Sequence, residues 1–444
     1  MDQPAKTPVA SEAATGPQTD ASPPAQAPPG GSAATSDHHD PRCRSYSDPH
    51  RHLTGCRDDL FHADETLARG WQGVRDALAQ RGIIPSLSYF GVLQTNATGG
   101  SHNAWVYAGQ LTAGLDLNLQ KLIGARGTSV YASFTWGTGG NLSSFLNSSI
   151  PVNGLYAPSY YLEELYLHKT FFEKTLKLAA GRIGPSNSFA KLPVFSDYTN
   201  YGVNPNPISL GKNDYSFFGP PPSTQWGAQA TYSINQSIQV ATGMFNTNLN
   251  SANGNRHGTD FALQEGNKGA LVLAEVDYFR DQGASDKGKP GAYVIGFVHD
   301  NNSFAALPDR NFKSDTYSGF YVLGQQMIYR PRGTDKEQGM TAWAAWTYNS
   351  NQLISPMPSY WGGGLSYEGL FPSRKRDTIS TAWIYGKVSD FIPATTAEKF
   401  LEVNYQWRHS GYLSFMPQFQ YIWRPSGHAV PGAAVAGIQV GLTF

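Results

Sequence analysis

The chain of 444 residues has few charged side chains, almost no cysteine and no long apolar run. Charged residues make up 15% of it, and 33 basic side chains balance 33 acidic ones. A neutral chain lacks the basic surface that binds nucleic acid, so we expect no nucleic acid partner. Since no stretch of eighteen apolar residues occurs, a transmembrane helix is excluded. The mean hydropathy of −0.38 fits a soluble protein, but it also fits a membrane barrel, because half of each strand then faces a polar interior.

Recognisable catalytic motifs are also missing. There is no G-x-S-x-G and no H-E-x-x-H, and the stretches "TGG" and "WGGGL" do not open helices that would hold a phosphate. We therefore expect no enzyme and no cofactor, although a Ser/His pair could still assemble from separate strands. The first thirty residues lack the apolar core of a signal peptide, so an exported form would be a processed chain from which that peptide has been removed.

The two cysteines, Cys43 and Cys56, lie close together in the N-terminal segment. Such a pair suggests an exported protein with one disulfide, the alternative being two unrelated thiols. Five of the eleven histidines fall within 38–62, which raises the question of a metal site. Their spacing matches no standard zinc pattern, and an oxidised cysteine pair offers no thiolate, so we expect no bound metal.

The pattern along the chain predicts three parts. Residues 1–41 are rich in Ala, Pro, Ser and Thr and have little to bury, which predicts a disordered leader. Within 42–82, apolar residues recur at helical spacing from Leu67 to Leu78, which predicts one short amphipathic helix that ends near Gly82. Helical periodicity then disappears, and residues 83–444 alternate between apolar and polar side chains, as β-strands do.

About sixteen alternating stretches follow one another to the C-terminus. We place them at 84–94, 103–120, 128–136, 159–171, 175–183, 224–234, 237–246, 268–279, 291–299, 316–330, 339–349, 360–371, 377–387, 397–408, 412–423 and 433–444. Short charged turns such as "FFEKT" and "RHSG" alternate with mostly longer loops rich in Asn, Gly, Ser and Pro. An even number of strands with connections sorted in this way is typical of an outer-membrane barrel, with the turns periplasmic and the loops outside.

The two faces of these stretches differ in chemistry. In "LEVNYQWRHS", Val403, Tyr405 and Trp407 share one face, while Glu402 and Asn404 share the other. The polar faces contain mainly Asn, Gln, Thr and Ser with isolated charges, which suits the wall of a water-filled pore better than the surface of a soluble sandwich. The apolar set that ends "GIQVGLTF" is then expected to face lipid, with Phe444 at the periplasmic rim. The fold class we predict is all-β, an antiparallel transmembrane β-barrel of about 16 strands.

Three stretches resemble the carbohydrate-selective porin family OprB. These are "GWQGVRDALAQRGI", "YLEELYLHKTFFEKTLKLAAGRI" and "LEVNYQWRHSGYLSFMPQFQYIWRPSG", and the similarity extends over about 69–444. The resemblance implies a sixteen-stranded outer-membrane porin through which monosaccharides and other small solutes, ions included, diffuse passively. It also implies that the N-terminal helix lies on the periplasmic side. The leader and the cysteine pair are not part of the family pattern.

A selective constriction for sugars should offer aromatic rings with planar hydrogen-bonding groups such as carboxylates and guanidinium. We single out six candidates for substrate binding: Glu164, Tyr166, His168, Arg182, Glu275 and Asp277. Glu164 and Arg182 lie in a stretch that resembles the family. Glu402 and Arg408 are further candidates. Glu163 either shares the lipid-facing parity or takes part in a bulge beside Glu164. For each residue the alternative is a charge that pairs across the wall and keeps the lumen wet.

The segment 184–223 carries many aromatic, proline and glycine residues. A stiff loop of this length could fold inward and narrow the pore, or it could cap the rim from outside. Trimers are common among sixteen-stranded porins, so a homotrimer is one option for the assembly. The competing function is a structural or adhesive outer-membrane barrel whose leader engages an envelope partner. Such a barrel would be occluded, whereas a porin would conduct.

Overall fold

The computed structural model of the protein describes residues 72–155, 160–172, 175–214, 224–247, 256–259, 261, 269–283, 286–308, 313–314 and 316–444. The chain divides into two compact units, Met1–Asp37 and His38–Phe444, and all described residues belong to the second. The expected leader, the Cys43–Cys56 disulfide, the histidine-rich stretch and the start of the predicted helix lie outside the described residues. Among the described residues, no helix combines the length and apolar character that crossing a membrane requires.

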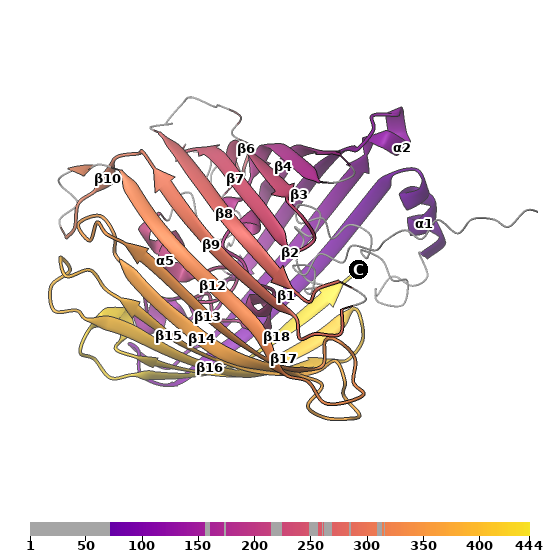
Figure 1. Ribbon diagram of the computed structural model, residues 1–444. Helices are drawn as coiled ribbons and strands as arrows, with labels where there is room; N and C mark the ends of the chain where they lie inside the picture. Colours follow the sequence, from indigo (N-terminus) through magenta and orange to yellow (C-terminus); the bar gives the residue numbers. More distant parts are fainter. Residues whose placement is uncertain are drawn as a thin grey trace, which may run out of the picture. The chain divides into compact units, whose positions relative to one another are not determined.

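Sixteen antiparallel strands form a closed barrel (Figure 1). Each barrel strand pairs with the barrel strands before and after it, and β1 closes the sheet by pairing with β18. The strands are β1 (Ile83–Thr98), β2 (Trp105–Asn118), β3 (Thr128–Gly139), β4 (Tyr160–Phe171), β5 (Leu176–Ile183), β6 (Gln225–Ser233), β7 (Ile238–Asn246), β8 (Ala270–Arg280), β9 (Gly291–Asp300), β12 (Tyr317–Tyr329), β13 (Gly339–Asn349), β14 (Ser359–Glu368), β15 (Thr378–Lys387), β16 (Ala397–Arg408), β17 (Leu413–Trp423) and β18 (Ala433–Thr443). The predicted number of strands and the predicted fold class are confirmed.

Short helices and one small hairpin connect or flank these strands. They are α1 (Gln72–Gln80), α2 (Leu119–Ile123), α3 (Ser143–Leu146), α4 (Pro185–Ser188), α5 (Ile208–Asn213), the 3₁₀ helices η5 (Pro193–Asp197) and η8 (Pro425–Gly427), and the hairpin of β10 (Phe304–Ala305) with β11 (Lys313–Ser314). Helix α4, η5 and α5 all belong to the connection between β5 and β6, the longest loop of the sequence.

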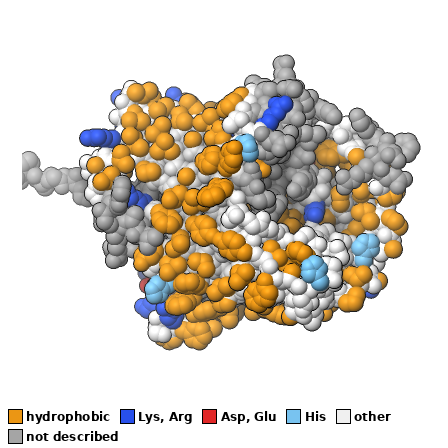
Figure 2. Space-filling view, turned by 180° about the vertical axis from the view of Figure 1, so that it is seen from behind, with side chains coloured by type: hydrophobic (Ala, Val, Ile, Leu, Met, Phe, Trp, Pro, Cys, Tyr) orange, Lys and Arg blue, Asp and Glu red, His pale blue; other side chains and the backbone are white. Residues whose placement is uncertain are grey.

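The barrel wall exposes apolar side chains outward and buries polar ones inward. Figure 2, which views the barrel from behind relative to Figure 1, shows many apolar side chains on the outer wall. Ile295 and Trp361 are 63% and 52% exposed, whereas Glu402 and Gln420, on the other parity, are fully buried. This two-residue alternation matches the sequence pattern, because successive side chains of a strand point to opposite faces. The interior is more apolar than predicted, since residues such as Leu271 and Phe400 are also buried there.

The last strand closes the barrel as its alternation predicts. Ile438 on β18 is 40% exposed, while Val440, Leu442 and Phe444 on the same parity are half-buried. The backbone N–H of Phe444 donates to Leu87 O at 2.9 Å, so the terminal residue is tied to β1. The pairing between β1 and β18 that closes the barrel therefore continues to Phe444.

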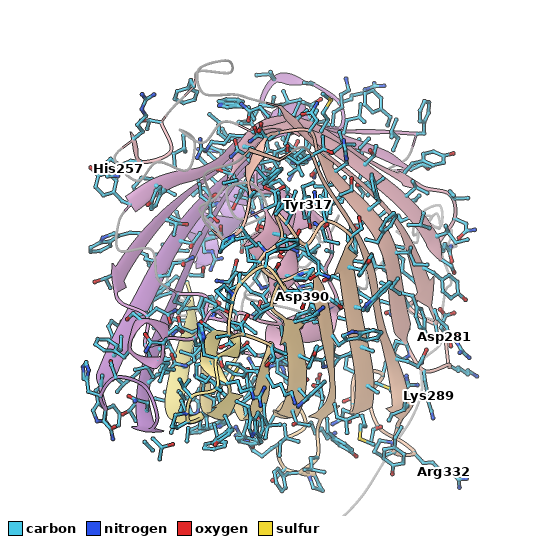
Figure 3. All side chains as sticks on the ribbon, turned by 90° about the vertical axis from the view of Figure 1, so that its left-hand side faces the viewer. His257, Asp281, Lys289, Tyr317, Arg332 and Asp390 are labelled. Atoms are coloured by element: carbon cyan, nitrogen blue, oxygen red, sulfur yellow. The ribbon has the colours of Figure 1, made fainter. Side chains whose placement is uncertain are left out.

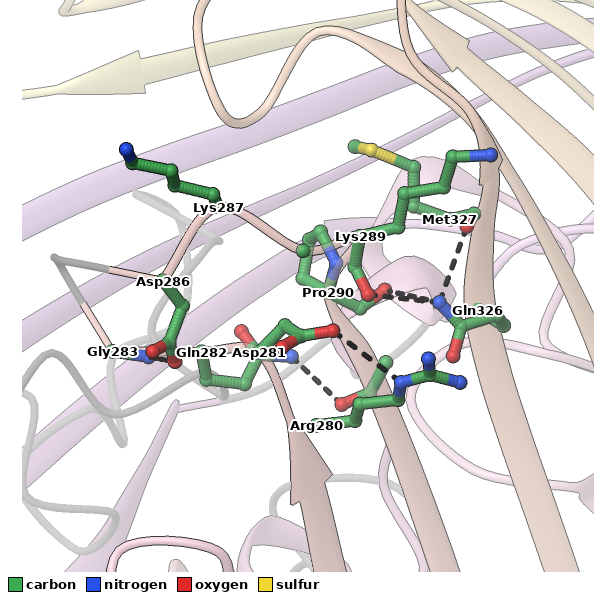
Figure 4. A network of polar contacts seen from close by, with 12 residues as sticks. Arg280, Asp281, Gln282, Gly283, Asp286, Lys287, Lys289, Pro290, Gln326 and Met327 are labelled. Atoms are coloured by element: carbon green, nitrogen blue, oxygen red, sulfur yellow. Dashed lines mark hydrogen bonds and ion pairs between the residues drawn. The ribbon is translucent and has the colours of Figure 1, made fainter.

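The two ends of the barrel differ in their connections. We call the end with the short turns after β2, β4, β6, β8, β12, β14 and β16 the turn end, and the opposite one the loop end. Figure 4 shows described residues of the connection between β8 and β9, 281–283 and 286–290, where Gln326 Nε2 donates to Lys289 O at 2.9 Å. The exposed ion pair Arg280–Asp281 in this turn adds little stability, because water screens it.

Helix α1 also lies at the turn end (Figure 1). It precedes Gly82, whose φ of +89° ends the helix and turns the chain into β1, as the sequence predicts. Lys121 Nζ donates to Ala79 O at 2.8 Å, and Asn118 N donates to Gly82 O at 2.7 Å. These bonds hold the end of the helix against the turn between β2 and β3.

Replacing Gly181 by Ala should destabilise the barrel. Gly181 on β5 has a φ of +146°, and a Cβ there would lie 2.4 Å from Leu165 O on β4. We expect Gly181→Ala to lower the free energy of unfolding by about 1–3 kcal/mol, from backbone strain and steric overlap. The matched control is Gly363→Ala, whose Cβ would meet its nearest atom at 3.4 Å. Urea unfolding in detergent, followed by tryptophan fluorescence, measures both variants, and equal stabilities would contradict the strain at Gly181.

Candidate functional site

Five of the six residues singled out for sugar contact face the barrel interior. They are Glu164, Tyr166 and His168 on β4, and Glu275 and Asp277 on β8. Their relative exposure ranges from 0% for Glu164 to 9% for His168. Their inward placement agrees with the sequence pattern, and their contact with sugar stays a prediction.

Arg182 on β5 is placed differently. The strand ladder pairs it with Leu165 on β4 and with Trp226 on β6, which share the parity of the outer wall, yet its side chain is fully buried. The neighbouring Gly181, with its φ of +146°, departs from regular extended backbone, so simple alternation does not hold at this point. Register alone therefore does not give the direction of the Arg182 side chain, and its full burial excludes a place on the exposed outer wall.

A bulge brings both glutamates of β4 inside. Ser133 on β3 pairs with Glu164, but the next residue, Phe134, pairs with Leu162, so Glu163 is the extra residue. Glu163 is 1% exposed and accepts a hydrogen bond from Thr135 Oγ1. Of the two alternatives for Glu163 the bulge is confirmed, because an extra residue lets two successive side chains avoid opposite faces.

Aromatic and polar groups of β2, β3 and β4 gather around Tyr166. The ring centroids of Tyr131 and Tyr166 are 5.4 Å apart, and those of Tyr166 and His168 are 6.2 Å apart. His168 Nε2 lies 3.5 Å from Asp116 Oδ2. Rings, an imidazole and carboxylates on one wall are the groups that hydrogen-bond and stack against a sugar.

The connection between β5 and β6 folds into the barrel. We call residues 184–214 the inward segment, since its side chains are almost all buried and it contacts the inner faces of strands far away in the sequence. Thus Tyr360 OH on β14 donates to Gly202 O at 2.9 Å, and Ser366 Oγ donates to Asp197 Oδ2 at 2.6 Å. For the described part of this connection, the inward path holds and the external cap does not.

Wall side chains accept hydrogen bonds from the backbone N–H groups of the inward segment. The pairs, each at 2.9 Å, are Gly184 N to Glu164 Oε1, Ala190 N to Glu275 Oε2, Val194 N to Gln325 Oε1, Thr199 N to Glu402 Oε1 and Asn200 N to Glu402 Oε2. A buried N–H without an acceptor costs free energy, and an irregular segment satisfies few of its own donors. The wall acceptors therefore hold the segment across the lumen, and the carboxylates among them make the stronger, charge-assisted bonds.

Apolar and aromatic contacts join the inward segment to β13. The ring centroids of Phe195 and Trp343 are 5.4 Å apart, and those of Tyr198 and Trp343 are 5.6 Å apart. Trp343 Nε1 donates to Tyr198 OH at 2.7 Å, and Tyr198 OH donates to Thr381 O at 3.0 Å. Each polar atom of this aromatic cluster is satisfied, which permits deep burial.

A second segment, 140–155 between β3 and β4, also enters the lumen. Glu398 on β16 accepts from Ser149 N at 3.2 Å, and Gln420 Nε2 on β17 donates to Val152 O at 3.0 Å. The two segments meet where Tyr201 N donates to Pro151 O at 3.1 Å. Together they occupy part of the barrel interior and are hydrogen-bonded to β4, β8, β12, β16 and β17.

Electrostatics around these segments combine buried charges of both signs. Lys212 in α5 is half-buried, and burial lowers its pKa while the nearby Glu398 carboxylate acts in the opposite direction. Near the turn end, Arg374 Nε donates to Asp377 Oδ2 at 2.8 Å, and Arg408 lies 4.0 Å from Glu368. Across the described residues, no group of three His, Cys, Asp or Glu side chains gathers that could hold a metal ion.

The sequence analysis missed several residues that hold the inward segments. Gln325, Trp343 and Glu398 share the inward parity of their strands, so period-two alternation could have placed them inside. Their role as anchors depends on the path of a loop up to about 250 residues away in the chain, and no periodicity carries that information.

Comparison with known proteins gives one family. The family model described as "Carbohydrate-selective porin, OprB family" matches residues 102–444. Porin B of Pseudomonas aeruginosa is 25% identical over 426 residues, covering 84% of this chain and 90% of that protein. The putative porin QuiX of Acinetobacter baylyi is 24% identical, covering 87% and 95%. The solved high-pH structure of Pseudomonas putida OprB has a TM-score of 0.79 at 22% identity, covering 86% of this chain and 99% of that one, which supports the fold.

Removing the Glu402 carboxylate should release part of the inward segment. Glu402→Ala leaves Thr199 N and Asn200 N without their acceptors, and a hydrogen bond to a charged group is worth about 1.5–3 kcal/mol. We expect hydrogen exchange at these two amides to become at least about tenfold faster, as measured by mass spectrometry of peptides from 195–205. The matched control is Glu398→Ala, which should speed hydrogen exchange at the Ser149 amide and leave exchange at the Thr199 amide slow. Unchanged exchange at Thr199 in Glu402→Ala would contradict the anchoring role.

Proposed function

Because this chain belongs to the OprB family of carbohydrate-selective porins, we propose that its barrel admits monosaccharides such as glucose by passive diffusion. Members of this family are channels of the Gram-negative outer membrane for sugars, and the chain is not an enzyme. The finer proposal concerns solute size and type: monosaccharides and similarly small polar solutes pass, and larger sugars pass slowly.

The observation that carries this proposal is the anchored inward segment. Residues 184–214 are held by wall acceptors on β4, β8, β12 and β16 and meet the segment 140–155. A constriction with satisfied backbone groups keeps its shape, and a fixed shape discriminates between solutes by size and by hydrogen bonding. Selectivity without tight binding follows, because a solute that bound strongly would block its own exit.

The six candidate residues contribute in three ways under this proposal. Glu164 and Glu275 shape the constriction through their bonds to the inward segment. Tyr166, His168 and Asp277 offer rings and polar groups to the sugar from the same side of the wall. Arg182, fully buried beside Gly181, supports the local structure of β5. The proposal assigns no metal and no cofactor to this site.

We assign the turn end to the periplasm and the loop end to the outside. The support is the sorting of short and long connections, which is typical of outer-membrane barrels. Helix α1, the segment 42–82 and the leader 1–41 would then lie on the periplasmic side, with the barrel over 83–444. The exposed apolar outer wall suits contact with outer-membrane lipid. A homotrimer stays a prediction, which the molar mass measured by gel filtration with light scattering would test.

Liposome swelling tests the proposed function on the purified, refolded protein. We expect rapid swelling with glucose, and slower swelling with a disaccharide and with an amino acid of similar size, because the constriction selects by shape and hydrogen bonding. Absence of swelling with every solute, from protein whose β-content shows a folded barrel, would remove the porin assignment. It would favour instead a structural or adhesive barrel whose leader engages an envelope partner.

Two substitutions then test the wall beside the inward segment. Glu164→Gln keeps the shape and an acceptor oxygen but removes the charge, so it should reduce the preference for glucose over the disaccharide by about twofold to tenfold with little loss of stability. Arg182→Ala should act mainly on stability, because the Arg182 side chain is fully buried. The control is Asp390→Asn, an exposed carboxylate paired with Lys387 at 2.9 Å. Equal selectivity of Glu164→Gln and this control would contradict a role for Glu164.

A further inference from the structure

Two buried carboxylates meet where the inward segment ends. Asp214 directly follows α5, and Asp300 is the last residue of β9. Their side chains are 1% and 0% exposed. Asp300 pairs in the ladder with Tyr317 on β12, which Figure 3 shows inside the barrel in a view from the loop end. The site therefore lies inside the wall, near the loop end.

Three oxygens of this carboxylate pair accept no hydrogen bond from an N–H group or a hydroxyl of the described residues. Asp300 Oδ1 accepts from Asn302 N at 2.6 Å, whereas Asp300 Oδ2 and both oxygens of Asp214 have no donor of these kinds in that part of the chain. The two groups also interact directly, since burial and then the charge of Asp300 raise the pKa of Asp214 well above its ordinary value. Among the described residues, no Lys or Arg pairs with either carboxylate.

Such a pair must be neutralised. An ionised carboxylate buried without a partner costs several kcal/mol, and two of them in contact cost more. A shared proton can bridge one oxygen of Asp214 to Asp300 Oδ2, and it leaves the second Asp214 oxygen without a partner. A cation between the groups satisfies all three oxygens at once.

We propose that Asp214 and Asp300 bind one hard divalent cation, Ca²⁺, which fastens the end of the inward segment to the barrel wall. Ca²⁺ accepts carboxylate, amide and water oxygens in a flexible arrangement, and a site with two carboxylates suits it better than the stricter octahedral Mg²⁺. Tyr317, Asn213 and Asn349 form the polar surroundings of the pair. Water completes the ligand set. With two carboxylates, affinity should fall in the range of about 10⁻⁴–10⁻³ M known for extracellular Ca²⁺ modules.

Isothermal titration with CaCl₂ tests this site on the full chain, refolded from urea into a non-ionic detergent and treated with EGTA. Refolding removes lipopolysaccharide, whose phosphates bind Ca²⁺. The probe is Ca²⁺, because the histidines within 38–62 bind softer metals and do not attract this ion. We expect one Ca²⁺ per chain in the wild type and in the control Asp390→Asn, and at least tenfold weaker binding in Asp214→Asn and Asp300→Asn.

Two results would overturn the proposal. One is the absence of Ca²⁺ binding in the wild type, and the other is equal binding by wild type and Asp214→Asn. Thermal unfolding gives a second readout: Ca²⁺ should raise the melting temperature of the wild type and not that of Asp300→Asn. If instead the melting temperature rises with acid and ignores Ca²⁺, the pair shares a proton and holds no cation. These results do not depend on whether sugar passes through the barrel.

Discussion

The structure depends on one constraint: every backbone N–H group that enters the barrel must find an acceptor there. An inward segment of some thirty residues whose helices are only one to two turns long cannot satisfy all of its own donors, and the wall supplies what is missing through Glu164, Glu275, Gln325 and Glu402. These acceptors come from four different strands. Their combined geometry gives the segment one path, so the charges of the inner wall determine the shape of the lumen as well as its polarity.

The same constraint explains why the interior is not simply polar. Where the inward segment packs against the wall, water is excluded, and apolar or aromatic side chains such as Trp343, Phe195 and Phe400 occupy the interface. Polar groups inside it are paired, as Trp343 is with Tyr198. The Asp214–Asp300 pair departs from this rule, since no described residue donates a hydrogen bond from an N–H group or a hydroxyl to three of its oxygens. That departure makes it a candidate ion site, at the point where the segment returns to the wall.

Most of the fold could be predicted from the sequence, because strand alternation and the sorting of short and long connections are local signals. All sixteen strands lie within a few residues of their predicted ranges. The candidate site could be predicted only in part. Alternation placed Glu164 and Glu275 inside, but it does not give the direction of the buried Arg182 side chain, because Gly181 beside it leaves regular extended backbone. The direction of the loop after β5 could not be predicted, because its aromatic composition suits an inward path and an external cap alike, and its anchors lie on distant strands.

Single-channel conductance of the double variant Glu275→Ala/Glu402→Ala in planar bilayers tests the central claim most directly. If wall carboxylates hold the inward segment across the lumen, their removal should loosen the constriction and give a larger, noisier conductance than the wild type. The exposed substitution Asp390→Asn should leave conductance unchanged. A double variant that folds as a barrel and conducts like the wild type would contradict the claim, and the shape of the lumen would then have to arise from the apolar contacts alone.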